Sequence, residues 1–197
     1  MTHMVASEHK FKTALACAPA SWKYTPVLFK GGFLKDWDEL FFSVEECIAR
    51  GTNYINPKTK KVTTLTGIGL HLCPITETCA IDFDGVGSPR NFEHQFNKSV
   101  KSLPPTITTT SGIPSRCQML FRVPKEYWKF IEGDTLKLES CSNIELRWGH
   151  GIQSVITGRH PNELKDGQGF YSFVPGRSPK DVELADLPTW VLDKWVE

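Results

Sequence analysis

The stretch Cys79-Ala80-Ile81-Asp82-Phe83-Asp84 ends an apolar run with two acidic residues that are separated by one position. This alternation predicts a β-strand with one buried and one exposed face. Because residues i and i+2 of a strand face the same way, both carboxylates should point to one side, roughly 7 Å apart. Two like charges so close gain little unless a cation lies between them, so the pair is a candidate metal site. The alternative is a solvated strand end that enters a turn at Gly85.

Periodicity outside this strand predicts a mixed α+β protein with hairpins and no βαβ repeat. One helix is predicted over 43–51, where Ser43-Val44-Glu45-Glu46 is a capping-box pattern. Another is predicted from Ser88 as N-cap, with Pro89 at its first position, to Pro104-Pro105, and its buried face would carry Phe92, Phe96 and Val100. Gly67 and Gly69 indicate that a second backbone passes close to the strand that contains them. Strands are predicted at 22–29, 66–72, 106–110, 117–123, 136–139, 143–147, 152–157 and 170–174, a short helix after Pro124, and a closing helix after Leu187-Pro188.

Composition limits the class of protein. The 197 residues, 40% of them apolar, suffice for one sizeable core or two small modules, and a formal charge of +1 is too low for a disordered chain. No apolar run approaches the roughly 20 residues that span a bilayer, and the N-terminus lacks a signal-peptide core. We therefore expect a cytoplasmic protein with no membrane partner. The charge leaves a nucleic-acid partner open, because a basic groove can lie within a neutral total.

The six cysteines, at positions 17, 47, 73, 79, 117 and 141, form no Cys-x-x-Cys pair. Most lie among apolar residues, where a thiol behaves as a small hydrophobic side chain. We expect reduced structural cysteines and predict no zinc, with a zinc site as the minor alternative.

A third acidic residue follows in the strand predicted at 143–147. Ile144 and Leu146 should face the core, so Glu145 and Arg147 should share the opposite face. Beside the aspartate pair, Glu145 would complete a site for two divalent ions. The alternative is a cross-strand salt bridge.

Two loops carry groups that suit phosphate. The turn Thr110-Ser111-Gly112-Ile113-Pro114-Ser115-Arg116 offers hydroxyls and backbone N–H groups, and Arg116 shares a strand face with Gln118. Arg159 and His160 follow the strand predicted at 152–157 and suit phosphate oxygens or a sugar. An ordinary hairpin turn and a structural His-Pro loop are the alternatives.

Taken in order, these segments resemble the bifunctional DNA primase/polymerase (Prim-Pol) domain of the archaeo-eukaryotic primase superfamily. The resemblance runs from about Trp22 to Trp195 and rests on order and spacing. Its segments are Asp82-x-Asp84, the Thr-Ser-Gly hairpin that leads to Leu120-Phe121-Arg122-Val123-Pro124, Glu145-Leu146-Arg147, Gly151-Ile152-Gln153-Ser154-Val155 and His160-Pro161, flanked by 30–37, Thr66-Gly67-Ile68-Gly69 and Leu187-Pro188-Thr189-Trp190.

The resemblance implies an RRM-like catalytic module, here about 76–197, packed on a smaller N-terminal α/β module, about 1–75. The active site would lie in the cleft between them. By matching position, Asp82, Asp84 and Glu145 would hold two Mg²⁺ or Mn²⁺ ions. The residues implied to hold the incoming nucleotide are Ser111, Gly112, Arg116, Gln118, Arg159 and His160.

Two positions depart from the family pattern. Many members carry a histidine after Ser-Gly, where this chain has Arg116-Cys117-Gln118. We interpret Arg116 as the triphosphate contact in its place. The third carboxylate is Glu145 rather than an aspartate, a difference of one methylene.

These observations predict a template-dependent nucleotidyltransferase that acts as a DNA primase and polymerase on a DNA template, a primer and dNTPs or NTPs. A catalytically weak replication-initiation or single-stranded DNA-binding module is the first alternative. A metal-dependent nuclease or glycosyltransferase is the second, although Gly85 and Val86 supply no further ligand. We also expect a longer protein with a C-terminal helicase or other replication domain. The weaker candidates for DNA contact are Lys58, Lys60, Lys61, Lys98 and Lys101.

Overall fold

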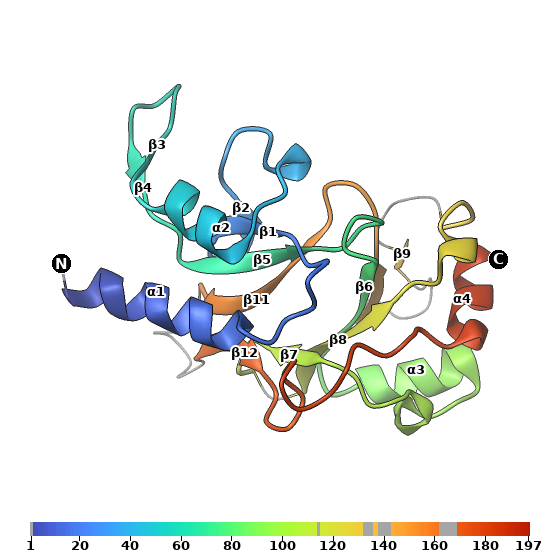
Figure 1. The fold of residues 1–197 in the computed structure, drawn as a ribbon. Coiled ribbons are helices and arrows are strands. Elements are labelled where there is room, and N and C mark those ends of the chain that lie inside the picture. The colour runs from blue at the N-terminus through green and yellow to red at the C-terminus, as the bar shows by residue number, and fades with distance from the viewer. Residues whose placement is uncertain (1, 114, 132–135, 138–142, 162–168) are drawn as a thin grey trace.

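A computed structural model describes residues 2–113, 115–131, 136–137, 143–161 and 169–197. Its main feature is a curled antiparallel sheet of ten strands in the order β2-β1-β5-β11-β12-β7-β8-β6-β10-β9 (Figure 1). The strands are β1 (Tyr24–Leu28), β2 (Gly31–Gly32), β5 (Gly67–His71), β6 (Thr78–Asp84), β7 (Thr108–Thr110), β8 (Arg116–Arg122), β9 (Leu136–Lys137), β10 (Ile144–Arg147), β11 (Gln153–Arg159) and β12 (Phe170–Phe173). The predicted α+β class is confirmed. Positions 138 and 139 of the strand predicted at 136–139 lie outside the described residues.

A separate hairpin, β3 (Tyr54–Ile55) and β4 (Val62–Thr63), stands out from the body of the protein (Figure 1). The described residues also form four α-helices: α1 (Thr2–Leu15), α2 (Val44–Gly51), α3 (Ser88–Phe96) and α4 (Thr189–Val196). Three short 3₁₀ segments complete the described helical structure, at Trp37–Glu39, Val100–Ser102 and Lys125–Tyr127.

The predicted capping box of α2 is confirmed. The Ser43 hydroxyl accepts a hydrogen bond from the Glu46 amide at 3.2 Å, and the Glu46 carboxylate accepts one from the Ser43 amide at 2.9 Å. Two of the amides that a helix start leaves without partners are thereby satisfied.

The third helix differs from the prediction at both ends. Gly87 precedes α3, so Ser88 is its first residue rather than its N-cap. Asn97, with φ at 49°, ends the helix, and Val100 therefore lies in the 3₁₀ segment that follows. The long N-terminal helix α1 was not predicted; within its part 9–15, Phe11 and Leu15 are buried in the core.

Two apolar clusters cover opposite faces of the sheet around β6. Ile81 and Phe83 pack with residues of α3 and α4 in one cluster, and Ala80 packs in the other with residues of α1, α2 and β5. Alternation along β6 therefore turns Asp82 and Asp84 away from α3 and α4. This placement leaves the face that carries both aspartates free to line a site.

The predicted close approach of backbones occurs where β5 meets β11. Gly67 and Gly158 are paired, and a Cβ on Gly67 would lie 2.6 Å from the Thr157 carbonyl oxygen. Gly69 likewise leaves room for the side chain of Gln153. This contact joins the N-terminal strands to β11, which borders the site described below.

In the described part of the chain, no helix is long and apolar enough to cross a membrane. The described cysteines, at positions 17, 47, 73, 79 and 117, are free thiols, and those at 47, 73 and 79 are buried. Cys141 lies outside the described residues.

Candidate active site

A row of polar side chains crosses four neighbouring strands of the sheet. Asp82 on β6 is paired directly with Gln118 on β8 and with Glu145 on β10, and Gln118 is paired with Thr109 on β7. Directly opposed residues of antiparallel strands share a face and have Cβ atoms about 5 Å apart. The register therefore brings the third predicted carboxylate beside the first. Asp84 lies on the same face, one step along β6, opposite Arg116.

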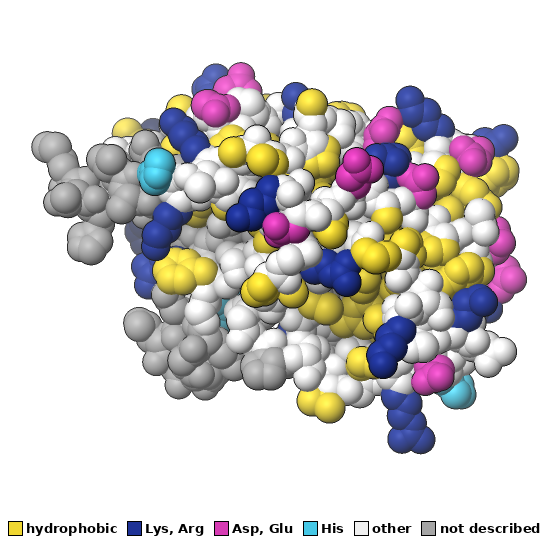
Figure 2. All heavy atoms as spheres, turned by 60° about the horizontal axis from the view of Figure 1, so that its bottom comes forward, with side chains coloured by type: hydrophobic (Ala, Val, Ile, Leu, Met, Phe, Trp, Pro, Cys, Tyr) yellow, Lys and Arg dark blue, Asp and Glu magenta, His cyan; other side chains and the backbone are white. Residues whose placement is uncertain are grey.

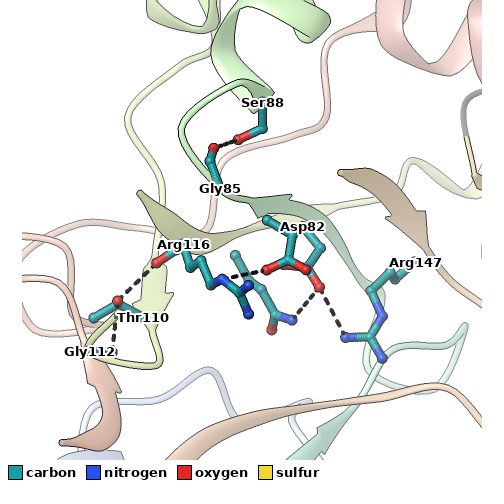
Figure 3. A network of polar contacts seen from close by, with 9 residues as sticks. Asp82, Gly85, Ser88, Thr110, Gly112, Arg116 and Arg147 are labelled. Carbon is teal, nitrogen blue, oxygen red and sulfur yellow. Dashed lines mark hydrogen bonds and ion pairs between the residues drawn. The ribbon is translucent and has the colours of Figure 1, made fainter. Parts of the chain in front are cut away.

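Arginines approach both aspartates (Figure 3). The Nε of Arg116 lies 2.9 Å from Oδ1 of Asp84, and Nη1 of Arg147 lies 3.7 Å from Oδ2 of Asp82. Gln118 donates a hydrogen bond from Nε2 to Oδ2 of Asp82 at 3.0 Å. The other terminal nitrogen of Arg147 donates to the Gln153 carbonyl at 2.9 Å.

Asp82 is in the more buried position of the aspartate pair, with 24% of its side chain exposed against 52% for Asp84. Burial raises the pKa of the Asp82 carboxyl above its ordinary value. The charge of Arg147 and the hydrogen bond from Gln118 oppose this rise, and the neighbouring carboxylates of Glu145 and Asp84 add to it. The ionised form of Asp82 is therefore held in a site that disfavours negative charge.

These groups line an open pocket of about 190 Å³. Six predicted site residues border it: Asp82, Asp84, Ser111, Arg116, Gln118 and His160. Glu145 lies beside Asp82 on the sheet but is not among the described residues that border the pocket, and the same is true of Gly112 and Arg159.

The loop that precedes β8 is organised by the Thr110 hydroxyl. This hydroxyl donates to the Arg116 carbonyl at 2.9 Å and accepts from the Gly112 amide at 3.1 Å (Figure 3). Gly112, at φ 79°, and Ser115, at φ 64°, allow the sharp reversal. The Gly112 N–H is thus used within the loop, whereas the Ser111 side chain faces the pocket region.

Sequence reasoning missed several residues at the pocket: Lys30, Thr109, Gln153, Val155 and Tyr171. Lys30 comes from the turn between β1 and β2, far from β6 in the sequence. The Tyr171 ring lies 5.3 Å from the His160 ring, and burial raises the Tyr171 pKa to about 12. Gln153, Val155 and Lys30 lie in segments that carry the family resemblance, which was the available signal for them. Tyr171 lies in no such segment, and the order of strands in the sheet brings it to the site.

Residues 14–190 match the family model described as "Bifunctional DNA primase/polymerase, N-terminal" (Prim-Pol). The chain belongs to this family. A search of curated proteins finds no match to the chain. The family match agrees with the resemblance that the motifs carry.

Within this Prim-Pol chain, no group of three His, Cys, Asp or Glu side chains among the described residues is arranged to hold a metal ion. Asp84 and Asp82 instead contact Arg116 and Arg147. The side-chain oxygen Oε1 of Gln118 is nevertheless buried and has no described partner.

The five predicted DNA-contacting lysines are all exposed but form two separate groups. Lys58, Lys60 and Lys61 lie at the tip of the β3–β4 hairpin, and Lys98 and Lys101 follow α3, at the opposite end of the molecule (Figure 1). On the face drawn in Figure 2, basic and acidic side chains are interspersed. No extended basic surface is visible on that face, in keeping with the near-neutral total charge.

Proposed function

We propose that this Prim-Pol chain is a template-dependent nucleotidyltransferase with DNA primase and DNA polymerase activity. A primer 3′-hydroxyl, or that of a first nucleotide, would attack the α-phosphate of a dNTP or NTP, and pyrophosphate would leave. The observation that carries this proposal is the row in which Asp82, Glu145 and Gln118 are side by side, next to Asp84, in a polar pocket.

The donor set suits Mg²⁺ or Mn²⁺. Asp82, Asp84 and Glu145 supply only carboxylate oxygens, which such hard cations prefer. The pKa of Asp82 is raised first by burial and to a smaller extent by the carboxylates of Glu145 and Asp84, and a bound cation would offset both effects. When bound, two such ions would help to deprotonate the attacking hydroxyl and would offset charge on the departing pyrophosphate. Ion binding requires Arg116 and Arg147 to move away from the aspartates that they contact.

The remaining pocket residues have distinct proposed roles. Gln118 orients Asp82 through its hydrogen bond. Arg116, once released from Asp84, is placed to contact phosphate oxygens with its guanidinium fork. His160 and Tyr171 form an aromatic wall against which a sugar or base can pack. Ser111, Gly112 and Arg159 are proposed as further nucleotide contacts from the two adjoining loops.

We also propose the family's two-module arrangement, with the pocket in the cleft between the modules. Strands β6, β7, β8 and β10 with α3 and α4 would form the RRM-like module. The smaller module would comprise α1, α2, β1, β2 and β5. The presence of Lys30, from the β1–β2 turn, in the pocket wall supports a site that both modules line.

The β3–β4 hairpin is the proposed contact for the DNA template and primer. In its turn, the Asn56 side chain accepts hydrogen bonds from the amides of Lys58 and Thr59 at 2.9 and 3.0 Å. The segment 53–64 contains three lysines and no acidic residue. An exposed cross-strand pair, Ile55 and Val62, adds apolar surface. Such a ribbon has the width that a DNA major groove admits, and its lysines suit phosphates.

Primer extension tests the proposal. A labelled primer–template, dNTPs and Mg²⁺ or Mn²⁺ are incubated with the protein and with Asp82→Asn, Asp84→Asn and Glu145→Gln variants. We expect metal-dependent extension that falls at least about 100-fold in each variant. Glu183→Gln, which removes an exposed carboxylate, is the matched control and should extend normally.

Other outcomes identify the alternatives. Extension that persists in all three carboxylate variants would contradict the assignment of the site. DNA binding without extension by either metal would favour the replication-initiation or single-strand-binding module. Shortening of the primer would indicate a nuclease.

A further inference from the structure

Among the described residues that border the pocket, one lysine or arginine has no carboxylate partner. Arg116 contacts Asp84, and Arg147 contacts Asp82, so each guanidinium faces a carboxylate. Lys30 also borders the pocket, and its ammonium makes no ion pair with any residue that the structure describes. Its charge is thus available to a ligand, whereas the arginine charges are partly offset.

The backbone of Lys30 is held in place from the site itself. Gln153 donates a hydrogen bond from Nε2 to the Lys30 carbonyl at 2.6 Å. The carbonyl of the same Gln153 accepts from Arg147, which reaches Asp82. A continuous chain of polar contacts therefore links the carboxylate row on β6 to the β1–β2 turn.

The turn is also fixed from its other side. Phe29 adopts a left-handed conformation, with φ at 62°, and its amide donates to the Thr66 hydroxyl at 2.6 Å. Gly69 lacks the Cβ that would collide with the Gln153 side chain. The main chain of Lys30 is thus rigid at the pocket rim, while its exposed side chain keeps the freedom of a four-carbon stem.

We propose that Lys30 binds the polyphosphate of the incoming nucleotide, an inference that rests on the proposed function. A nucleoside triphosphate brings several negative charges into the pocket, more than the single charge of Arg116 can offset once it is released from Asp84. An ammonium group is a compact charge with three donors and contacts phosphate oxygens without needing a fixed plane. Lys30 therefore supplies, from the N-terminal strands, a positive charge in addition to those of Arg116 on β8 and Arg147 on β10.

Equilibrium binding of dATP and of dAMP, each with Mg²⁺ and without DNA, tests this role. Lys30→Ala should weaken dATP binding about tenfold or more, the range of a lost charge-assisted hydrogen bond, and dAMP binding at most twofold. Lys30→Arg should retain dATP binding within about threefold. Lys35→Ala is the matched control, since Lys35 is an exposed lysine that pairs with Asp36, and it should bind both nucleotides normally.

Comparing dATP with dAMP distinguishes a contact of Lys30 with the β- and γ-phosphates from a structural effect of the substitution. An equal loss of dATP and dAMP binding in Lys30→Ala would overturn the proposal, as would unchanged dATP binding. Loss of primer–template affinity with dATP binding intact would assign Lys30 to DNA instead and would equally overturn it. If the unsubstituted protein binds neither nucleotide, the proposed function fails as well, a result distinct from failure of Lys30 alone.

Discussion

Replacing Gly158 by alanine should destabilise the protein by about 4 kcal/mol. The added Cβ would fall inside contact distance of the Gly67 Cα and 2.6 Å from the Thr66 carbonyl oxygen. Both are backbone atoms that cannot rotate away, so β5 and β11 must separate, at about 2 kcal/mol for overpacking. The φ of +136° at Gly158 suits glycine almost alone and adds about 2 kcal/mol for any other residue.

Thermal unfolding followed by circular dichroism measures this effect. For a chain of 197 residues, each kcal/mol lowers Tm by roughly 2–4 °C, so Gly158→Ala should unfold about 10 °C lower. Two control variants separate the steric contribution from the conformational one. Gly176→Ala has φ at +73° with no atom within 4 Å of the new Cβ, so it carries conformational strain alone, about 1 kcal/mol. Gly31→Ala meets nothing within 4 Å and has no positive φ, so it should change stability by at most about 0.5 kcal/mol.

The difference in Tm between Gly158→Ala and Gly176→Ala tests the contact between β5 and β11. If Gly158→Ala unfolds within about 3 °C of Gly176→Ala, the close approach of Gly67 and Gly158 does not exist and the reasoning fails. The same contact positions β11 at the pocket. Binding of dATP should therefore weaken in Gly158→Ala and remain normal in Gly31→Ala.

Three further predictions follow from charge. Asp82→Asn should raise the free energy of unfolding at pH 7 without divalent ions by about 1 kcal/mol, because the ionised carboxyl is disfavoured in the fold. Because the pKa of Asp82 is raised, the difference should shrink in denaturant titrations as the pH falls and the carboxyl takes up a proton. Burial lowers the pKa of His71 from 6.5 to about 4, so protons bind the unfolded chain first and stability should fall by about 3 kcal/mol between those pH values. A His71→Gln variant should lose that pH dependence in the same titrations; an unchanged slope would show that other groups cause it. Changing Lys58, Lys60 and Lys61 to Gln should reduce the slope of log affinity against log salt for primer–template DNA by about 2–3, measured by fluorescence anisotropy, and an unchanged slope would exclude the hairpin from the DNA contact.

Local patterns in the sequence determined most elements and their faces. The alternation at 79–84 predicted that Asp82 and Asp84 share one face, and the structure places them so because a strand has a period of two. The capping box at Ser43 and the strand positions around the site were likewise predictable, because hydrogen bonds and apolar periodicity act over a few residues. Helix α1 was not, since in its part 9–15 the buried residues are Phe11 and Leu15, too few to reveal a helical period.

The composition of the pocket was decided by the tertiary structure. The two glycines of β5 indicated that some backbone comes close, but only the sheet order shows that it is β11, at Gly158. Likewise, no sequence spacing relates Lys30 or Tyr171 to Asp82, and the contact between Arg147 and Asp82 depends on the register of β10 against β6. Strand order and register arise from burial and pairing across the whole chain. The sequence therefore determined which residues could act, and the fold decided which of them meet.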